Sequence, residues 1–165
     1  MALILANDGI HPAGKEILEN AGFQVQTDKV EQDNLAFFIQ DNAVVAVLVR
    51  SATQITEKEL TASDSLKAIG RAGVGLDNID LKSAETNGVT VANTPAASSQ
   101  SVAELVLAHL FTVSRFLQQS NRDMPTSGTT DFGKLKKSYS KGSELQGKTL
   151  GIVGIGRIGQ ALAKM

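Results

Sequence analysis

Short apolar segments alternate with amphipathic segments through the first half of the chain. The apolar segments are rich in β-branched residues and predict strands at residues 2–6, 23–25, 43–49, 66–69 and 89–91. Apolar positions at helical spacing between them predict helices at residues 12–21, 34–39, 56–62 and 81–86. Segment 43–49 (AVVAVLV) is apolar throughout, which is typical of a parallel strand buried on both faces. The alternation predicts an α/β fold with a flavodoxin-like, doubly wound parallel sheet.

The pattern changes after the fifth predicted strand. Apolar residues recur at helical spacing from Ser101 to about Asn121, and SVAE at 101–104 predicts a capping box between Ser101 and Glu104. Residues 124–147 are polar and rich in Gly, Ser, Thr and Lys, which predicts a surface connection. The apolar run at 150–153 predicts one more strand.

A glycine-rich turn follows that run. Residues 154–159 (GIGRIG) fit the G-x-G-x-x-G pattern that opens a helix in dinucleotide-binding units, with Arg157 and Ile158 inside the turn. Gly154 would permit the tight turn, Gly156 would let the backbone approach a pyrophosphate, and Gly159 would let helix and strand pack closely. The alternative is an ordinary strand-to-helix turn without a ligand.

Two arginines predict an anion site at the edge of the sheet. Arg50 follows the third predicted strand, and Arg71 lies in the glycine-rich segment 70–75 (GRAGVG) after the fourth. Ligands of open α/β sheets bind beyond the carboxyl ends of the strands, and Arg binds carboxylate or phosphate through two parallel hydrogen bonds. A tight loop with solvated arginines is the alternative interpretation.

Composition narrows the classes of function. The chain has 165 residues, a net charge of −1, no cysteine and two histidines, so disulfides and thiolate metal sites are excluded and a histidine metal cluster is not expected. The chain has no excess of basic residues, which would be expected of a protein that binds nucleic acid. No apolar stretch reaches the roughly 20 residues that span a bilayer. We expect a cytoplasmic protein in which His11 starts a helix and His109 packs on the apolar side of the long helix.

Four spaced motifs carry a resemblance that covers essentially the whole chain. They are GRAGVGLDNID at 70–80, NTP at 93–95, SVAE at 101–104 and LQGKTLGIVGIGRIG at 145–159. Together they resemble the D-2-hydroxyacid dehydrogenases. The resemblance implies a substrate domain at residues 1–95, and, at 96–165, an interdomain helix, a linker and the first β-α unit of an NAD-binding Rossmann domain.

The resemblance also implies an activity. It points to NAD-dependent oxidation of 3-phosphoglycerate to 3-phosphohydroxypyruvate in serine biosynthesis, by a homodimer or higher homo-oligomer. The alternatives are another dehydrogenase of the glyoxylate or hydroxypyruvate reductase type, and a non-catalytic NAD-sensing protein similar to a corepressor.

Site residues follow from the same resemblance. The family's catalytic arginine, carboxylate and histidine lie beyond the glycine turn, so no catalytic residue is assigned here. The expected substrate-binding residues are Arg50, Ser51, Arg71 and Gly73. The expected cofactor-binding residues are Val74, Gly154, Gly156, Arg157, Ile158 and Gly159.

Overall fold

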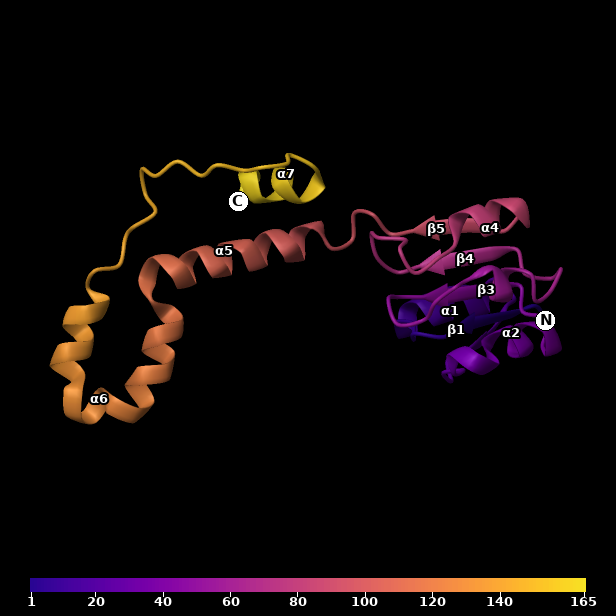
Figure 1. The fold of residues 1–165 in the computed structure, drawn as a ribbon, viewed down its shortest axis with the longest axis horizontal. Helices are drawn as coiled ribbons and strands as arrows, with labels where there is room; N and C mark the ends of the chain where they lie inside the picture. The colour runs from indigo at the N-terminus through magenta and orange to yellow at the C-terminus, as the bar shows by residue number, and fades with distance from the viewer. The chain divides into compact units, whose positions relative to one another are not determined.

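The computed structural model describes all residues from 1 to 165 and divides them into two compact units (Figure 1). The first unit is Met1–Ala97 and the second is Ser98–Met165. The division lies two residues after the boundary expected at residue 95. Each unit is described by itself below.

The first unit is built on one parallel sheet. Its strands are β1 (Leu3–Ala6), β2 (Gln24–Gln26), β3 (Ala46–Val49), β4 (Ala68–Arg71) and β5 (Thr90–Asn93). Every pair is parallel, and the strand order is β2-β1-β3-β4-β5. This is the order of flavodoxin-like doubly wound folds, in which the direction of winding reverses between β1 and β3. The predicted fold class is confirmed.

Four helices connect these strands: α1 (Pro12–Asn20), α2 (Gln32–Asp41), α3 (Glu57–Leu60) and α4 (Leu81–Thr86). His11 starts α1 as predicted, because its Nδ1 accepts from the N–H of Ala13 at 3.2 Å. Helix α2 packs against α3, and α3 against α4. The apolar core lies where α2, α3 and α4 pack on the sheet, and it includes Leu5, Leu35, Ile39, Val47 and Ile69, each fully buried. Helix α1 contributes no buried residue.

Each predicted strand differs from the observed strand by one to three residues at one end or both, and a turn explains the two largest differences. The predicted strand at 43–49 begins only at Ala46, because Ala43 (φ 46°) and the bond from the N–H of Val44 to the carbonyl of Ile39 complete the turn after α2. The fourth strand is Ala68–Arg71 and not 66–69, because Leu66 donates back to the carbonyl of Ser63 in a turn. Apolar side chains at 44 and 66 are buried without belonging to a strand.

The second unit contains three helices: α5 (Ser99–Arg115), α6 (Leu117–Tyr139) and α7 (Arg157–Lys164). The capping box predicted at 101–104 is wrong. Ser98 is already helical (φ −95°, ψ 0°), so Ser101 lies inside α5, and Glu104 accepts from the side chain of Gln100. Helix α5 also ends earlier than predicted, at Phe116, whose left-handed backbone (φ 55°, ψ 34°) interrupts the helix.

Residues 117–139 are helical, so the predicted surface connection at 124–147 is wrong for most of its length. No residue of α6 is buried, which agrees with its polar sequence. The helix bends at Asp131 (φ −119°, ψ 21°) and doubles back, as Figure 1 shows. The Tyr139 hydroxyl therefore donates to Asp123 Oδ2 at 2.6 Å, and its ring lies 6.2 Å from that of Phe116.

The strand predicted at 150–153 is absent. This segment has no neighbouring strand to pair with, and Val153 is fully exposed. Helix α7 packs along α5, with Leu162 and Gly159 buried. None of the helices is both long enough and apolar enough to cross a membrane.

Candidate functional site: a polar pocket at the carboxyl edge of the sheet

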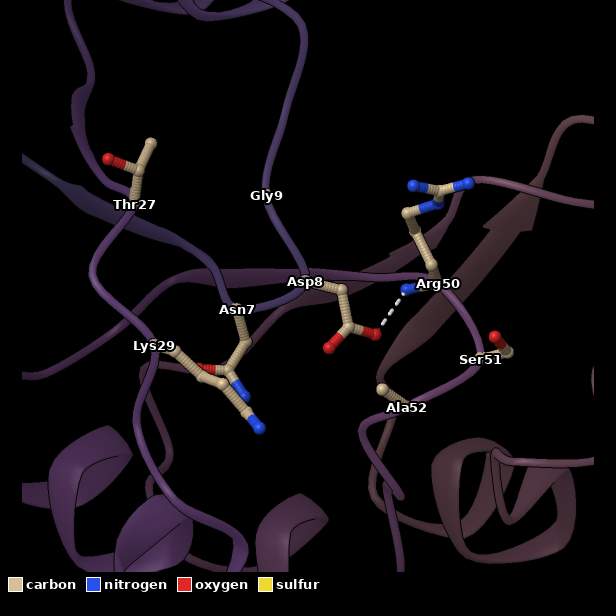
Figure 2. A pocket seen from close by; sticks show the side chains of 8 residues that line it. All are labelled: Asn7, Asp8, Gly9, Thr27, Lys29, Arg50, Ser51 and Ala52. Atoms are coloured by element: carbon tan, nitrogen blue, oxygen red, sulfur yellow. Dashed lines mark hydrogen bonds between the residues drawn. The ribbon is translucent and has the colours of Figure 1, made fainter.

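A pocket of about 550 Å³ lies at the carboxyl ends of β1, β2 and β3 in the first unit (Figure 2). Neighbouring parallel strands end at the same edge of a sheet, so the segments that follow them meet there. The lining residues come from these three segments: Asn7, Asp8 and Gly9 after β1; Thr27 and Lys29 after β2; Arg50, Ser51 and Ala52 after β3.

The Asp8 carboxylate holds the segment after β3. Its Oδ2 accepts from the backbone N–H of Arg50 at 2.6 Å and from that of Thr53 at 3.2 Å. Its Oδ1 accepts from the Thr53 hydroxyl at 2.6 Å. One side chain from the end of β1 thus fixes both ends of the turn that presents Arg50 and Ser51.

Two buried asparagines hold the same turn from other sides. Asn78 Nδ2 donates to the carbonyls of Arg50 at 3.0 Å and Thr53 at 2.7 Å. Asn7 Nδ2 donates to Thr53 Oγ1 at 2.9 Å, while Asn7 Oδ1 accepts from the N–H of Val30. The bonds donated by these two buried amides hold the loop, although Asn78 Oδ1 itself is buried without a partner.

The cationic side chains of the pocket are available to a ligand. The Arg50 guanidinium takes part in no ion pair, and Figure 2 shows it directed away from the Asp8 carboxylate. Lys29 Nζ lies 3.8 Å from a carboxylate oxygen of Glu31, and an exposed ion pair of this kind contributes little energy. Arg50 and Lys29 line the pocket together with Ser51 and Thr27, and such cations can bind a carboxylate or phosphate.

The same network sets the protonation state of Asp8. Burial by itself would raise the pKa of this carboxyl group. Hydrogen bonds from the Thr53 hydroxyl and from the backbone N–H groups of Arg50, Thr53 and Ala52 outweigh it, so the pKa lies below the ordinary value of 3.8. Asp8 is therefore ionised at neutral pH, with its charge directed into the loop.

Arg71 and Gly73, expected to bind substrate, lie in the neighbouring loop and do not line the pocket. A Cβ on Gly73 would overlap the Arg71 guanidinium, which folds back over this loop, and Arg71 Nε is buried without a partner. The loop is joined to β5, since Asn93 Nδ2 donates to the carbonyl of Val74 at 2.8 Å. Of the four predicted substrate-binding residues, the structure thus brings together only Arg50 and Ser51 in the pocket.

The glycine turn belongs to the second unit. Gly154 adopts φ 94°, so the tight turn predicted there is confirmed, and α7 begins at Arg157 directly after it. A Cβ on Gly159 would overlap the carbonyl oxygen of Gly154, whereas a Cβ on Gly156 would meet no protein atom. The open space at Gly156 fits close approach of a ligand to the backbone.

Sequence reasoning missed six of the eight residues that line the pocket: Asn7, Asp8, Gly9, Thr27, Lys29 and Ala52. The same rule that selected Arg50 would have found these residues, because each follows a strand at the carboxyl edge of the sheet. His109, expected to pack in the apolar side of the long helix, is exposed.

The architecture is that of an α/β protein with a ligand pocket at the carboxyl edge of a doubly wound sheet. The family model for the D-isomer specific 2-hydroxyacid dehydrogenase catalytic domain matches residues 3–151. The chain belongs to this family, which confirms the resemblance seen in its motifs.

Known relatives agree with this assignment. The chain is 38% identical over 161 residues to D-3-phosphoglycerate dehydrogenase of Rattus norvegicus, covering 97% of this chain and 29% of that protein. It is 39% identical over 159 residues to hydroxypyruvate reductase of Thermotoga maritima, covering 96% and 49%. The apo structure of D-mandelate dehydrogenase from Rhodotorula graminis shares the fold, with a TM-score of 0.82, 21% identity, and coverage of 99% of this chain and 51% of that one. The chain spans about half the length of the second relative and less of the first.

Proposed function

We propose that the protein carrying this sequence oxidises 3-phosphoglycerate to 3-phosphohydroxypyruvate with NAD, as a step of serine biosynthesis. The observation that carries the proposal is the unpaired Arg50 guanidinium beside Ser51 in a pocket at the carboxyl edge of the sheet. A substrate with a phosphate and a carboxylate needs such cationic groups to bind. The named phosphoglycerate dehydrogenase relative supports this substrate.

Residue roles follow from the two units. We assign Met1–Ala97 as the substrate domain, in which Arg50 and Ser51 bind an anionic group of the substrate. Arg71 and Gly73, in the next loop outside the pocket, are assigned to the substrate by the family resemblance alone. We assign the second unit to an interdomain helix, a linker and the start of the nucleotide domain. The catalytic proton-transfer residues lie outside these assignments.

NAD would supply the acceptor for the hydride removed from the hydroxyl-bearing carbon. The turn at 154–159 fits such a group, because Gly154 takes the left-handed turn and the position of Cβ at Gly156 is open. Gly154, Gly156, Arg157, Ile158 and Gly159 would hold the pyrophosphate, and Val74 would face the nicotinamide. We place the protein in the cytoplasm as a homodimer or higher homo-oligomer.

Hydroxypyruvate reduction is the second candidate, because the Thermotoga relative of that name is as similar as the first. The two candidates differ in the need for phosphate recognition. Lys29 and Arg50 supply two cations at one pocket, which favours a substrate with a phosphate as well as a carboxylate.

The test is a steady-state assay of the protein that carries this sequence, in which the formation of reduced nicotinamide is followed by its absorbance. We expect kcat/KM to be higher for 3-phosphoglycerate than for unphosphorylated glycerate. Arg50→Ala should raise KM for 3-phosphoglycerate roughly tenfold to hundredfold, the equivalent of a charge-assisted contact, without changing KM for NAD. Equal rates with both substrates would overturn the phosphorylated substrate, and hydroxypyruvate turnover would then favour the second candidate.

A further inference from the structure

We infer that Asp8 is a positioning residue for the anion site: its carboxylate holds the turn at 50–53 so that Arg50 and Ser51 face the ligand. The inference rests on the proposed function, because it concerns the same pocket. It adds a residue that carries the wrong charge for binding an anion directly. Its place in the pocket therefore needs a separate explanation.

The hydrogen bonds supply that explanation. The Asp8 carboxylate accepts from backbone N–H groups and one hydroxyl of the turn, and it pairs with no cationic side chain. The bond from the Arg50 N–H fixes the backbone of this residue, while its guanidinium extends away from the carboxylate (Figure 2). Asp8 thus orders the residue that carries the cation without neutralising that cation.

Burial at the rear of the turn strengthens the argument. Thr53, whose N–H and hydroxyl donate to Asp8, is 3% exposed. Asn78, which donates to two carbonyls of the same turn, is 4% exposed. Thr53 Oγ1 donates to Asp8 while it accepts from Asn7, so removing the carboxylate leaves this buried hydroxyl without its acceptor. The turn would also lose the acceptor after β1 to which the backbone N–H of Arg50 donates.

Direct electrostatics and positioning predict opposite results. If Asp8 acted only through its charge, its removal would reduce repulsion and tighten the binding of anions. If Asp8 acts by ordering the turn, the turn of the variant is disordered before the anion binds. Binding is then weaker, because part of the free energy of the anion contacts is used to order the turn. The direction of the change in Kd therefore separates the two.

The experiment is an NMR titration of the 165-residue chain with inorganic phosphate and with 3-phosphoglycerate. Resonances of the folded chain report Kd independently of global stability. We expect Asp8→Ala to raise both Kd values about tenfold, which is about the net worth of one charged hydrogen bond. Asp8→Asn keeps the shape and one oxygen acceptor and should recover most of the affinity. The matched control is Asp28→Ala, which removes an exposed carboxylate outside the pocket and should leave both Kd values within about twofold.

Each outcome is decisive. Unchanged or tighter binding by Asp8→Ala, with normal binding by the unsubstituted chain, overturns the positioning role and leaves the proposed function intact. Failure of the unsubstituted chain to bind either anion at millimolar concentration means that the proposed substrate pocket itself is wrong. If Asp8→Ala does not fold, the second variant is Thr53→Val, which removes the hydroxyl bond and keeps the carboxylate. Weaker anion binding by Thr53→Val than by the unsubstituted chain supports the inference, and equal binding contradicts it.

Discussion

The two units of this chain bury their apolar residues to very different extents. In Met1–Ala97, strands and helices enclose a core in which Leu5, Ile39 and Ile69 have no exposed surface. In Ser98–Met165, only Ala103, Gly159 and Leu162 are buried, while Val113 is 79% exposed and Val153 fully exposed. Both sequences carry apolar patterns, but only the first pattern is matched by neighbouring elements within its unit.

The difference explains why the pocket with a fixed lining lies in the first unit. Its pocket is formed by three consecutive strand ends and fixed by buried amides and one carboxylate. In the second unit the glycine turn depends on local backbone conformation and on the contact of α7 with α5. A packed sheet holds side chains in place more firmly than a helix pair with few buried residues.

The largest expected effect lies in the core of the first unit. Ile69→Ala removes a fully buried side chain from β4 and should lower the free energy of unfolding of that unit by about 2–5 kcal/mol. Val113→Ala replaces an exposed side chain of α5 and should change the free energy of unfolding of the second unit by less than about 0.5 kcal/mol. Urea unfolding followed by far-UV circular dichroism measures both. Equal losses for the two variants would refute the contrast between the units.

A smaller effect is expected at the glycine turn. Gly159→Ala places a Cβ against the Gly154 carbonyl and should destabilise the packing of α7 by about 1–3 kcal/mol. Gly156→Ala meets no protein atom and should leave α7 unchanged. Amide hydrogen exchange along α7 measures the difference. If both variants exchange like the unsubstituted chain, the turn is looser than its backbone geometry indicates.

The next prediction tests whether α6 doubles back. The hydrogen bond to Asp123 raises the pKa of Tyr139 above the ordinary value of 10.0, with burial adding to the effect. A raised pKa means that the stabilisation is present below pH 10 and is lost as the pH rises through the raised value. Tyr139 is the only tyrosine, so ultraviolet titration reports it alone. Asp123→Asn should lower the pKa of Tyr139 toward 10.0. An ordinary Tyr139 pKa in the unsubstituted chain would contradict the doubling back of α6.

The smallest effect is expected from the titration of Asp8. Its lowered pKa means that its contribution to stability is present above its unfolded pKa of about 3.9 and is lost as the pH falls through the lower folded value. The amide shifts of Arg50 and Thr53 should therefore titrate with a midpoint below the ordinary 3.8. A midpoint above the ordinary 3.8 would show that the bonds to the turn do not form.

The first unit could be predicted from sequence because its apolar periods correspond to real contacts. All five strands and four helices were anticipated, and the helix predicted at 81–86 begins after Asp80, which accepts from the N–H of Ser83. Of the predicted site residues of this unit, Arg50 and Ser51 line the pocket. Arg50 carries an obvious charge, whereas the role of Asp8 depends on a contact across 42 residues that no local pattern contains.

The second unit was harder for a physical reason. The polar sequence of α6 gives no apolar period, and its helix includes Pro125, a residue that predicts an interruption. The left-handed backbone of Phe116 has no sequence signal, since such conformations favour glycine or asparagine. The run at 150–153 has the composition of a strand but no neighbouring strand, and composition alone does not supply one.

The central claim is that Arg50 and Ser51 form an anion site at the carboxyl edge of the sheet. The most direct measurement is an NMR titration of the unsubstituted chain and Arg50→Ala with 3-phosphoglycerate. We predict that shifts concentrate in the segments after β1, β2 and β3, and that Arg50→Ala weakens binding at least about tenfold. Saturable shifts located elsewhere, or equal affinity in both proteins, would contradict the account.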